Sequence, residues 1–191
     1  MTSPIKLALI YGSAREGRFC ETVARWTAAQ IVERDRFALD VIDPAILAIS
    51  ALGGRSDAIV RAALSERIGE ADAFVVVTPE YNHSFPAPLK QLIDSVSEEW
   101  RAKPVAFVSY GGISGGLRAV EHLRHVFAEL HAVTVRDTVS FANAWSQFDV
   151  HGALNDPTYA NAAMKVMLQR LSWWANALSA ARAVEPYADA A

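Results

Sequence analysis

The sequence predicts an α/β protein in which helices cover both faces of a five-stranded parallel sheet. Short and almost continuously apolar runs, typical of strands buried on both faces, alternate along the chain with longer segments whose apolar residues recur at helical spacing. Strands and helices that alternate in this way are joined by right-handed crossovers, which place helices on both sides of the sheet. The expected architecture is therefore a three-layer α/β/α sandwich.

Bulk composition sets the class of protein. The 191 residues suit one domain spanning 1–191, and no repeat or linker divides them. With 18 Lys and Arg against 21 Asp and Glu, the net charge of −3 offers no basic patch for nucleic acid. Cys20 is the single cysteine, so no internal disulfide forms, as in a reducing cytoplasm. The run 7–11 is too short for a signal or membrane segment. We expect a soluble, cytoplasmic domain with no nucleic-acid or membrane partner.

Three of the expected strands lie in the first half of the chain, at 6–11, 37–43 and 73–77. Apolar residues at helical spacing predict a helix after each strand, at Val23, Trp26, Thr27 and Ile31, then at Val60, Ala63, Leu64 and Ile68, then at Leu89, Leu92, Ile93, Val96 and Trp100. A loop with Gly53 and Gly54 precedes the second helix, for which Asp57 is a candidate N-cap.

The second half continues the alternation. Strands are predicted at 104–108 and 133–136, with a helix between them marked by Val120, Leu123, Phe127 and Leu130. Residues 140–156 show no clear period, although their aromatic side chains argue against disorder. A last helix is predicted at 158–181. In such sheets ligands bind beyond the carboxyl ends of the strands, so a crevice is expected between the loops after strands one, three and four.

The loop after the first strand, 12–18, predicts an anion site. A strand that turns into a helix directs backbone N–H groups and the positive end of the helix dipole outward. Ser13, Arg15 and Arg18 add a hydroxyl and two guanidinium groups, which suits a phosphate monoester. The spacing matches neither G-x-G-x-x-G nor a loop ending in G-K-[ST], so a dinucleotide or nucleoside triphosphate site is not indicated. An ordinary polar turn with solvated arginines is the alternative.

The other two loops predict the walls of a flat pocket. Pro79, Pro86 and Pro88 stiffen the loop after the third strand, where the backbone of 79–82 could run along a heterocycle and Tyr81 cover it. Alternatively, Tyr81 is a half-buried loop aromatic and Asn82 an Asx-turn residue. The turn 109–116 contains four glycines, which either allow the backbone to approach a ligand closely or simply make a flexible connection.

Taken together, these segments resemble the NADPH-dependent FMN reductase family of flavodoxin-like proteins. The resemblance covers roughly 6–130 and depends on Gly12-Ser13-x-Arg15, on Pro79-Glu80-Tyr81-Asn82 followed by Leu89-Lys90 and Asp94, and on the glycine turn. It implies a flavodoxin-like fold, noncovalently bound FMN, NADPH or NADH as co-substrate, and electron transfer to quinones, free flavin, azo dyes or metal oxyanions. It also implies a homodimer or homotetramer with the flavin near the subunit interface.

Carried over by position, the resemblance places Ser13 and Arg15 on the FMN phosphate and the following backbone beside them. It sets 79–82 along the isoalloxazine and 110–116 on its other side. The expected cofactor-binding residues are Ser13, Arg15, Arg18, Phe19, Cys20, Pro79, Glu80, Tyr81, Asn82, Tyr110, Gly111, Gly112, Ser114, Gly115 and Gly116. Many relatives have Ser at the position of Arg18 and Asn at that of Cys20. No catalytic side chain is expected, because the flavin carries the reaction, and His83 receives no role.

Other classes of function have some support in the sequence. Gly112 to Gly116 satisfies G-x-S-x-G, so an esterase could use Ser114 with His151 and either Asp137 or Asp149. A passive FMN electron carrier is a further alternative, although the strong acidity usual for that class is missing. His122 and His125 lie three apart on a predicted helix, but no cluster completes a metal site. The tryptophans Trp100, Trp145, Trp173 and Trp174, with Phe148, are candidates for an interface or for the core.

Overall fold

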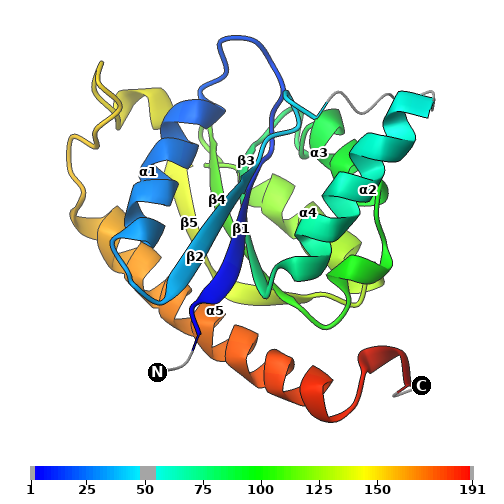
Figure 1. Cartoon of the computed structure of the whole chain (residues 1–191). Helices are drawn as coiled ribbons and strands as arrows, with labels where there is room; N and C mark the ends of the chain where they lie inside the picture. Colours follow the sequence, from blue (N-terminus) through cyan, green and yellow to red (C-terminus); the bar gives the residue numbers. More distant parts are fainter. Residues whose placement is uncertain (1–2, 48–54, 190–191) are drawn as a thin grey trace.

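A computed structural model describes residues 3–47 and 55–189 and shows a parallel sheet between two layers of helices (Figure 1). The strands, in the order β2-β1-β3-β4-β5, are β1 (Ile5–Tyr11), β2 (Phe37–Ile42), β3 (Ala73–Pro79), β4 (Pro104–Gly111) and β5 (Val133–Ala142). The helices are α1 (Cys20–Val32), α2 (Arg55–Glu70), α3 (Ala87–Asp94), α4 (Leu117–Glu129) and α5 (Thr158–Val184). The predicted α/β class and the five-stranded parallel sheet are confirmed.

Two apolar cores lie on opposite faces of the sheet. Leu7 and Leu9 of β1 face the core under α1 and α5, whereas Ala8 and Ile10 face the core under α2, α3 and α4. This alternation is the period of two that a strand imposes on its side chains. Residues of β1, β3 and β4 are therefore buried on both faces, which is why their sequences read as continuous apolar runs.

The strands extend further toward their carboxyl ends than the apolar pattern predicts. Thr78 and Pro79 belong to β3 and pair with Ser109 and Tyr110 of β4, which runs on to Gly111. The expected short strand at 133–136 is the ten-residue β5. Polar and glycine residues end the apolar runs, but hydrogen bonds between neighbouring strands continue past them, so the predicted loops at 78 and 109 began too early.

Other differences concern helices. α3 ends at Asp94, so Val96 and Trp100 lie outside it, Trp100 in a short 3₁₀ helix (Glu98–Trp100). Trp100 stays in the core, because its indole N–H donates to the carbonyls of Ile93 and Val96 at 3.2 Å each. Of the face expected on α2, Leu64 and Ile68 are buried and Ala63 is exposed. The Gly53 and Gly54 loop and the side chain of Asp57 lie outside the described residues.

The region 140–156 is ordered around aromatic contacts. After β5 comes a 3₁₀ helix (Ala144–Ser146), and an isolated bridge then pairs Phe148 with Leu154. The ring of Phe148 lies 5.7 Å from that of Phe19 and 5.2 Å from that of Phe141. The segment therefore closes the end of the core beside α1.

β1 and β3 lie very close together at their carboxyl ends, where the first and third loops begin. The chain leaves β1 for β2 on one side and reaches β3 on the other, so this pair is the switch point of the sheet. The N–H of Gly12 donates to the carbonyl of Val77 at 2.7 Å. A Cβ at Gly12 would lie 2.6 Å from that carbonyl oxygen and 2.9 Å from the Cα of Thr78, both backbone atoms. Only glycine fits there.

We expect Gly12→Ala to lower the free energy of unfolding by about 1–3 kcal/mol, because backbone must shift to admit the methyl group. Gly112→Ala is the matched control, since a Cβ at Gly112 would meet nothing within 4 Å. Urea unfolding monitored by circular dichroism measures both variants. Equal stability of the two variants would contradict the packing described.

Candidate functional site

The loops after β1, β3 and β4 meet at the carboxyl edge of the sheet, as expected. Ser13 and Tyr81 share a hydrogen bond of 3.1 Å between their hydroxyl oxygens, which joins the first loop to the third. The N–H of Glu80 donates to the carbonyl of Tyr110 at 3.1 Å, which joins the third loop to the fourth strand. These contacts bring together residues that lie far apart in the sequence.

The first loop ends in a helix terminus that lacks a cap. α1 has 13 residues, and no side chain caps its N-terminus at Phe19. Within the described parts of the chain, the backbone N–H groups of Glu16, Gly17 and Phe19 donate to no backbone or side-chain acceptor. The positive end of the helix dipole adds to these unpaired donors. These unpaired backbone donors, hereafter the cradle, therefore lie where the sequence predicts an anion site.

The side chains around this cradle divide into free and engaged groups. Arg15 is exposed, and its backbone N–H donates to the Ser13 hydroxyl at 3.3 Å. Ser13 itself is only 1% exposed. Arg18 instead points to Asp43 and binds both of its carboxylate oxygens, so its guanidinium is not open to a ligand as the sequence suggested.

Phe19 and Cys20 contribute little side-chain surface to the cradle. Phe19 is partly buried against Tyr110, with ring centroids 5.9 Å apart. Cys20 is fully buried, and its thiol donates to the carbonyl of Val77 at 3.6 Å. Burial raises the pKa of the Cys20 thiol, so the neutral form is favoured. Cys20 could contact a ligand only through its backbone, whereas Phe19 keeps part of its surface exposed.

The third loop contains a tight turn between Tyr81 and Ser84. Each of these residues donates its N–H to the carbonyl of the other, at 2.8 and 3.0 Å. The two central residues have positive φ, 49° at Asn82 and 74° at His83, which is the pattern of a type I′ turn. Asn82 is thus a left-handed turn residue. The turn leaves Tyr81 36% exposed at the edge of the site.

Glu80 connects the third loop to the fourth. Its side chain is 6% exposed, with one carboxylate oxygen 2.5 Å from a guanidinium nitrogen of Arg118. The other oxygen accepts hydrogen bonds from the Ser114 hydroxyl at 2.6 Å and from the Arg118 N–H at 3.3 Å. Burial opposes ionisation of Glu80, but these hydrogen bonds and the guanidinium outweigh it and lower its pKa. The side chains of Glu80 and Ser114 therefore bind each other rather than face the site.

The glycines of the fourth loop serve the protein's own packing. Gly115 and Gly116 have φ of 61° and 83°. A Cβ at Gly115 would collide with Ser140, and one at Gly116 would lie 2.8 Å from the backbone nitrogen of Tyr110. The expectation that these two glycines admit a ligand is therefore not supported. Gly111 is buried, whereas Gly112 is partly open and its carbonyl accepts the N–H of Asn143 at 2.9 Å.

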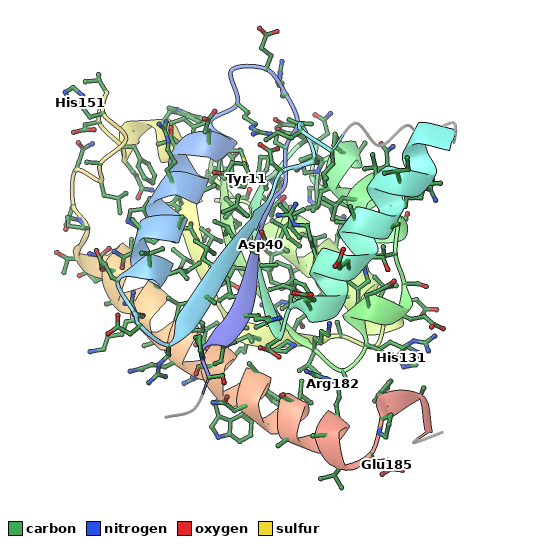
Figure 2. All side chains as sticks on the ribbon, viewed as in Figure 1. Tyr11, Asp40, His131, His151, Arg182 and Glu185 are labelled. Atoms are coloured by element: carbon green, nitrogen blue, oxygen red, sulfur yellow. The ribbon has the colours of Figure 1, made fainter. Side chains whose placement is uncertain are left out.

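The esterase arrangement is not present. Ser114 donates to Glu80, and no hydrogen bond joins it to a histidine in the described part of the chain. Asp137 pairs with Arg170 at 2.9 Å, and Asp149 accepts the N–H of His151 at 2.9 Å. Figure 2 shows His151 at the outer end of its loop on the α1 side of the molecule. The G-x-S-x-G pattern here is part of a strand-to-helix turn held by an acidic side chain.

Local sequence patterns did not single out Asp43, Arg118 or Ser84. Asp43 binds Arg18, and Arg118 binds Glu80. The Ser84 hydroxyl shares a hydrogen bond of 3.0 Å with Nδ1 of His122. The positions of Asp43 at a strand end and of Arg118 in a first helical turn could have marked them as candidates for the site. The sequence around them does not identify the residues that they pair with. Within the described residues, no group of three or more His, Cys, Asp or Glu side chains could hold a metal ion. None of the helices described there is long and apolar enough to cross a membrane.

Comparison with known families and curated proteins gives matches over much of the chain. Residues 5–146 match the model of a family described as NADPH-dependent FMN reductase. The chain is 34% identical over 131 residues to an NAD(P)H-dependent FMN reductase of Schizosaccharomyces pombe, a match that spans 63% of this chain and just 64% of the relative. It is 34% identical over 167 residues to an NAD(P)H:quinone oxidoreductase of Solanum tuberosum, covering 80% and 84%, and 33% identical over 155 residues to a quinone reductase of Escherichia coli, covering 71% and 76%.

Solved structures show the same fold. An NADH:FMN oxidoreductase in its apo form superposes with a TM-score of 0.71 at 22% identity, covering 85% of this chain and 88% of that one. A flavodoxin from the domain Archaea gives a TM-score of 0.60 at 12% identity, covering 89% and 99%. The fold is therefore flavodoxin-like.

The Glu80 contacts yield a pH-dependent prediction. Because the folded-state pKa of Glu80 lies below its ordinary value of 4.5, its contribution to stability is present above pH 4.5 and is lost as pH falls through the folded value. We expect Glu80→Gln to lower the free energy of unfolding by about 1–2 kcal/mol at pH 7 and by much less near pH 3.

Urea unfolding at the two pH values measures this difference. Glu98→Gln is the control, since Glu98 also pairs with an arginine but is 77% exposed, and it should change little. A Glu80→Gln effect that is the same at both pH values would show that the carboxylate charge is not responsible.

Proposed function

The chain belongs to the NADPH-dependent FMN reductase family, and on that premise we propose that it binds FMN where the three loops meet and uses it to move electrons from NADPH or NADH to a small acceptor. The observation that carries the proposal is the loop leading into α1, where the backbone N–H groups of Glu16, Gly17 and Phe19 are unpaired within the described residues and no side chain there caps the helix. A phosphate monoester supplies the acceptors and the negative charge that such a terminus favours. FMN is the flavin with that group.

The residues of the site fit this cofactor in distinct roles. The unpaired backbone N–H groups of Ala14, Glu16, Gly17 and Phe19 and the exposed guanidinium of Arg15 would hold the phosphate. The backbone of 79–82 and the ring of Tyr81 would lie along the isoalloxazine, with 110–112 beyond it. The hydrogen bond between Ser13 and Tyr81 sets the spacing between the phosphate end and the ring end.

The chain itself supplies binding and orientation rather than an acid or base. FMN, when bound, supplies the chemistry of accepting a hydride and of passing two electrons on. The carboxylate of Glu80 is held by Ser114 and Arg118, and the phenol of Tyr110 is buried, with burial raising its pKa. Neither group is free to exchange protons with a substrate near pH 7.

A quinone is the acceptor that we propose first. Relatives in Solanum tuberosum and Escherichia coli are named as quinone oxidoreductase and quinone reductase. Ile113, next to the open Gly112, is 89% exposed and offers apolar surface at the site to a quinone ring. Free flavin and similar acceptors remain within the same proposal, as does a cytoplasmic location, which suits a single unpaired thiol.

Ping-pong kinetics should follow if one site serves both substrates. NADPH or NADH would bind, lose its hydride and leave before the acceptor enters. We expect the purified protein with added FMN to oxidise NADPH in the presence of a quinone, with parallel lines in double-reciprocal plots. Initial rates over a grid of both substrates measure this.

The same assay separates the competing functions. Intersecting lines would contradict the ping-pong order, and binding of FMN without any oxidation of NADPH or NADH would favour a passive electron carrier. An absorbance spectrum of the protein after gel filtration, with and without added FMN, reports cofactor binding independently of turnover.

We also propose that the protein forms a homodimer or homotetramer, supported by an apolar stripe on the outer face of α5. Tyr159, Ala163, Val166 and Trp173 recur at helical spacing on the side away from the core, and Tyr159 and Trp173 are 85% and 63% exposed. The stripe borders a groove of about 940 Å³ between α4, the edge strand β5 and α5. A second copy is the occupant that a symmetric oligomer implies. Trp100 and Phe148, considered for an interface, are buried in the core instead.

Light scattering tests the assembly. The wild type should have the mass of two or four chains at micromolar concentration, and Trp173→Glu should shift it toward one chain, because a charge would be buried in the contact. Ile59→Glu is a control at a 76% exposed position on α2, which covers the other face of the sheet. A monomeric wild type would refute the interface.

A further inference from the structure

A buried ion pair lies beneath the phosphate cradle. The guanidinium of Arg18 binds both carboxylate oxygens of Asp43 and donates to the carbonyl of Ser13, and the bond from Nη1 to Oδ1 of Asp43 measures 2.7 Å. The two side chains are 9% and 11% exposed. Buried charges persist in proteins when each is paired and hydrogen-bonded, which is the case here.

The pair joins three separate elements. Ser13 follows β1, Arg18 precedes α1 by two residues, and Asp43 follows β2. Oδ1 of Asp43 also accepts the N–H of Ala45 at 2.9 Å, which fixes the turn after β2. The guanidinium lies 5.1 Å from the centre of the Tyr11 ring. The first loop is therefore held at both ends by this contact, at the carbonyl of Ser13 and at the side chain of Arg18.

The bond to Ser13 determines how the next peptide points. In a planar trans peptide, the carbonyl of one residue and the N–H of the next point in opposite directions. Because the carbonyl of Ser13 is turned to Arg18, the N–H of Ala14 points to the opposite side of the loop. No acceptor for it is found within the described residues. Arg18 thus orients a donor of the cradle without contacting the ligand itself.

A direct bond from Arg18 to phosphate is disfavoured, because its side chain is 9% exposed and three of its five N–H donors are already engaged. Its guanidinium already donates to two carboxylate oxygens and a carbonyl, and leaving Asp43 would strand a buried carboxylate next to a phosphate dianion. Arg15, by contrast, is exposed and forms no ion pair among the described residues. The two arginines of the loop therefore differ in what they can do.

We propose that Arg18 and Asp43 are positioning residues, which hold the backbone donors of the first loop in place for the cofactor phosphate, while Arg15 is the arginine that contacts it. The inference rests on the proposed function, since it specifies how this chain binds the phosphate of FMN. It also assigns a role to Asp43, which follows β2, whereas the residues expected to bind the cofactor follow or end β1, β3 and β4.

Asp43→Asn distinguishes the two roles by the sign of its effect. If Arg18 bound phosphate directly, removal of the competing carboxylate would leave FMN affinity equal or higher. If the pair positions the loop, FMN should bind about tenfold more weakly, as expected when about one charge-assisted bond is lost. Fluorescence titration of FMN gives the Kd. Riboflavin, which lacks the phosphate, should lose much less affinity, a difference that general destabilisation would not produce.

Controls make each outcome decisive. Asp40→Asn removes the carboxylate of another pair on β2, in which Asp40 lies 2.6 Å from Arg67, and should leave the Kd of FMN unchanged. If Asp43→Asn does not fold, Arg18→Lys decides, because lysine keeps a phosphate-binding charge but not the two-pronged bond. A Kd near wild type for Arg18→Lys, or undiminished FMN binding by Asp43→Asn, overturns the proposal. Failure of the wild type to bind FMN would instead refute the proposed function.

Discussion

Burial of the central strands on both faces constrains the rest of this molecule. β1, β3 and β4 are covered by helices on each side, so a polar group can meet a ligand only where a strand ends. Parallel pairing brings all the carboxyl ends to one edge of the sheet (Figure 1), and the order β2-β1-β3-β4-β5 makes the three polar loops neighbours. Gly12 and Val77 lie in close contact at this edge, and this contact sets the distance between the first loop and the third.

Most charged and hydroxyl side chains at that edge bind other protein groups. Arg18 pairs with Asp43, Glu80 binds Ser114 and Arg118, and Ser13 reaches Tyr81. These bonds tie the three loops together and leave mainly backbone donors and an aromatic ring facing the site. Such a surface suits a cofactor that performs the chemistry itself and needs chiefly to be held and oriented.

Local sequence patterns were sufficient for the fold and for the meeting of the three polar loops at one edge of the sheet. Apolar periodicity predicted each strand and helix, and the polar loops marked the carboxyl edge. It misplaced the ends of β3 and β4, because Thr78 and Ser109 pair across the sheet despite their polarity. It also could not identify the partners of Arg18 and Glu80, which lie 25 and 38 residues away, since no local pattern specifies pairing across the sheet. The left-handed pair Asn82 and His83 was likewise hidden, because two successive residues other than glycine seldom both have positive φ.

The unpaired backbone donors of the loop before α1 connect the supply of cofactor to the lifetime of the protein. Among the described residues, the loop before α1 has unpaired backbone donors and the helix has no side-chain cap, so without an anion this part of the chain lacks the contacts that a bound phosphate would supply. A ligand that binds only the folded chain raises its stability in proportion to the logarithm of ligand concentration over Kd. A cell short of flavin would therefore hold this protein in its more protease-sensitive form, and its abundance would follow flavin availability without a dedicated regulator.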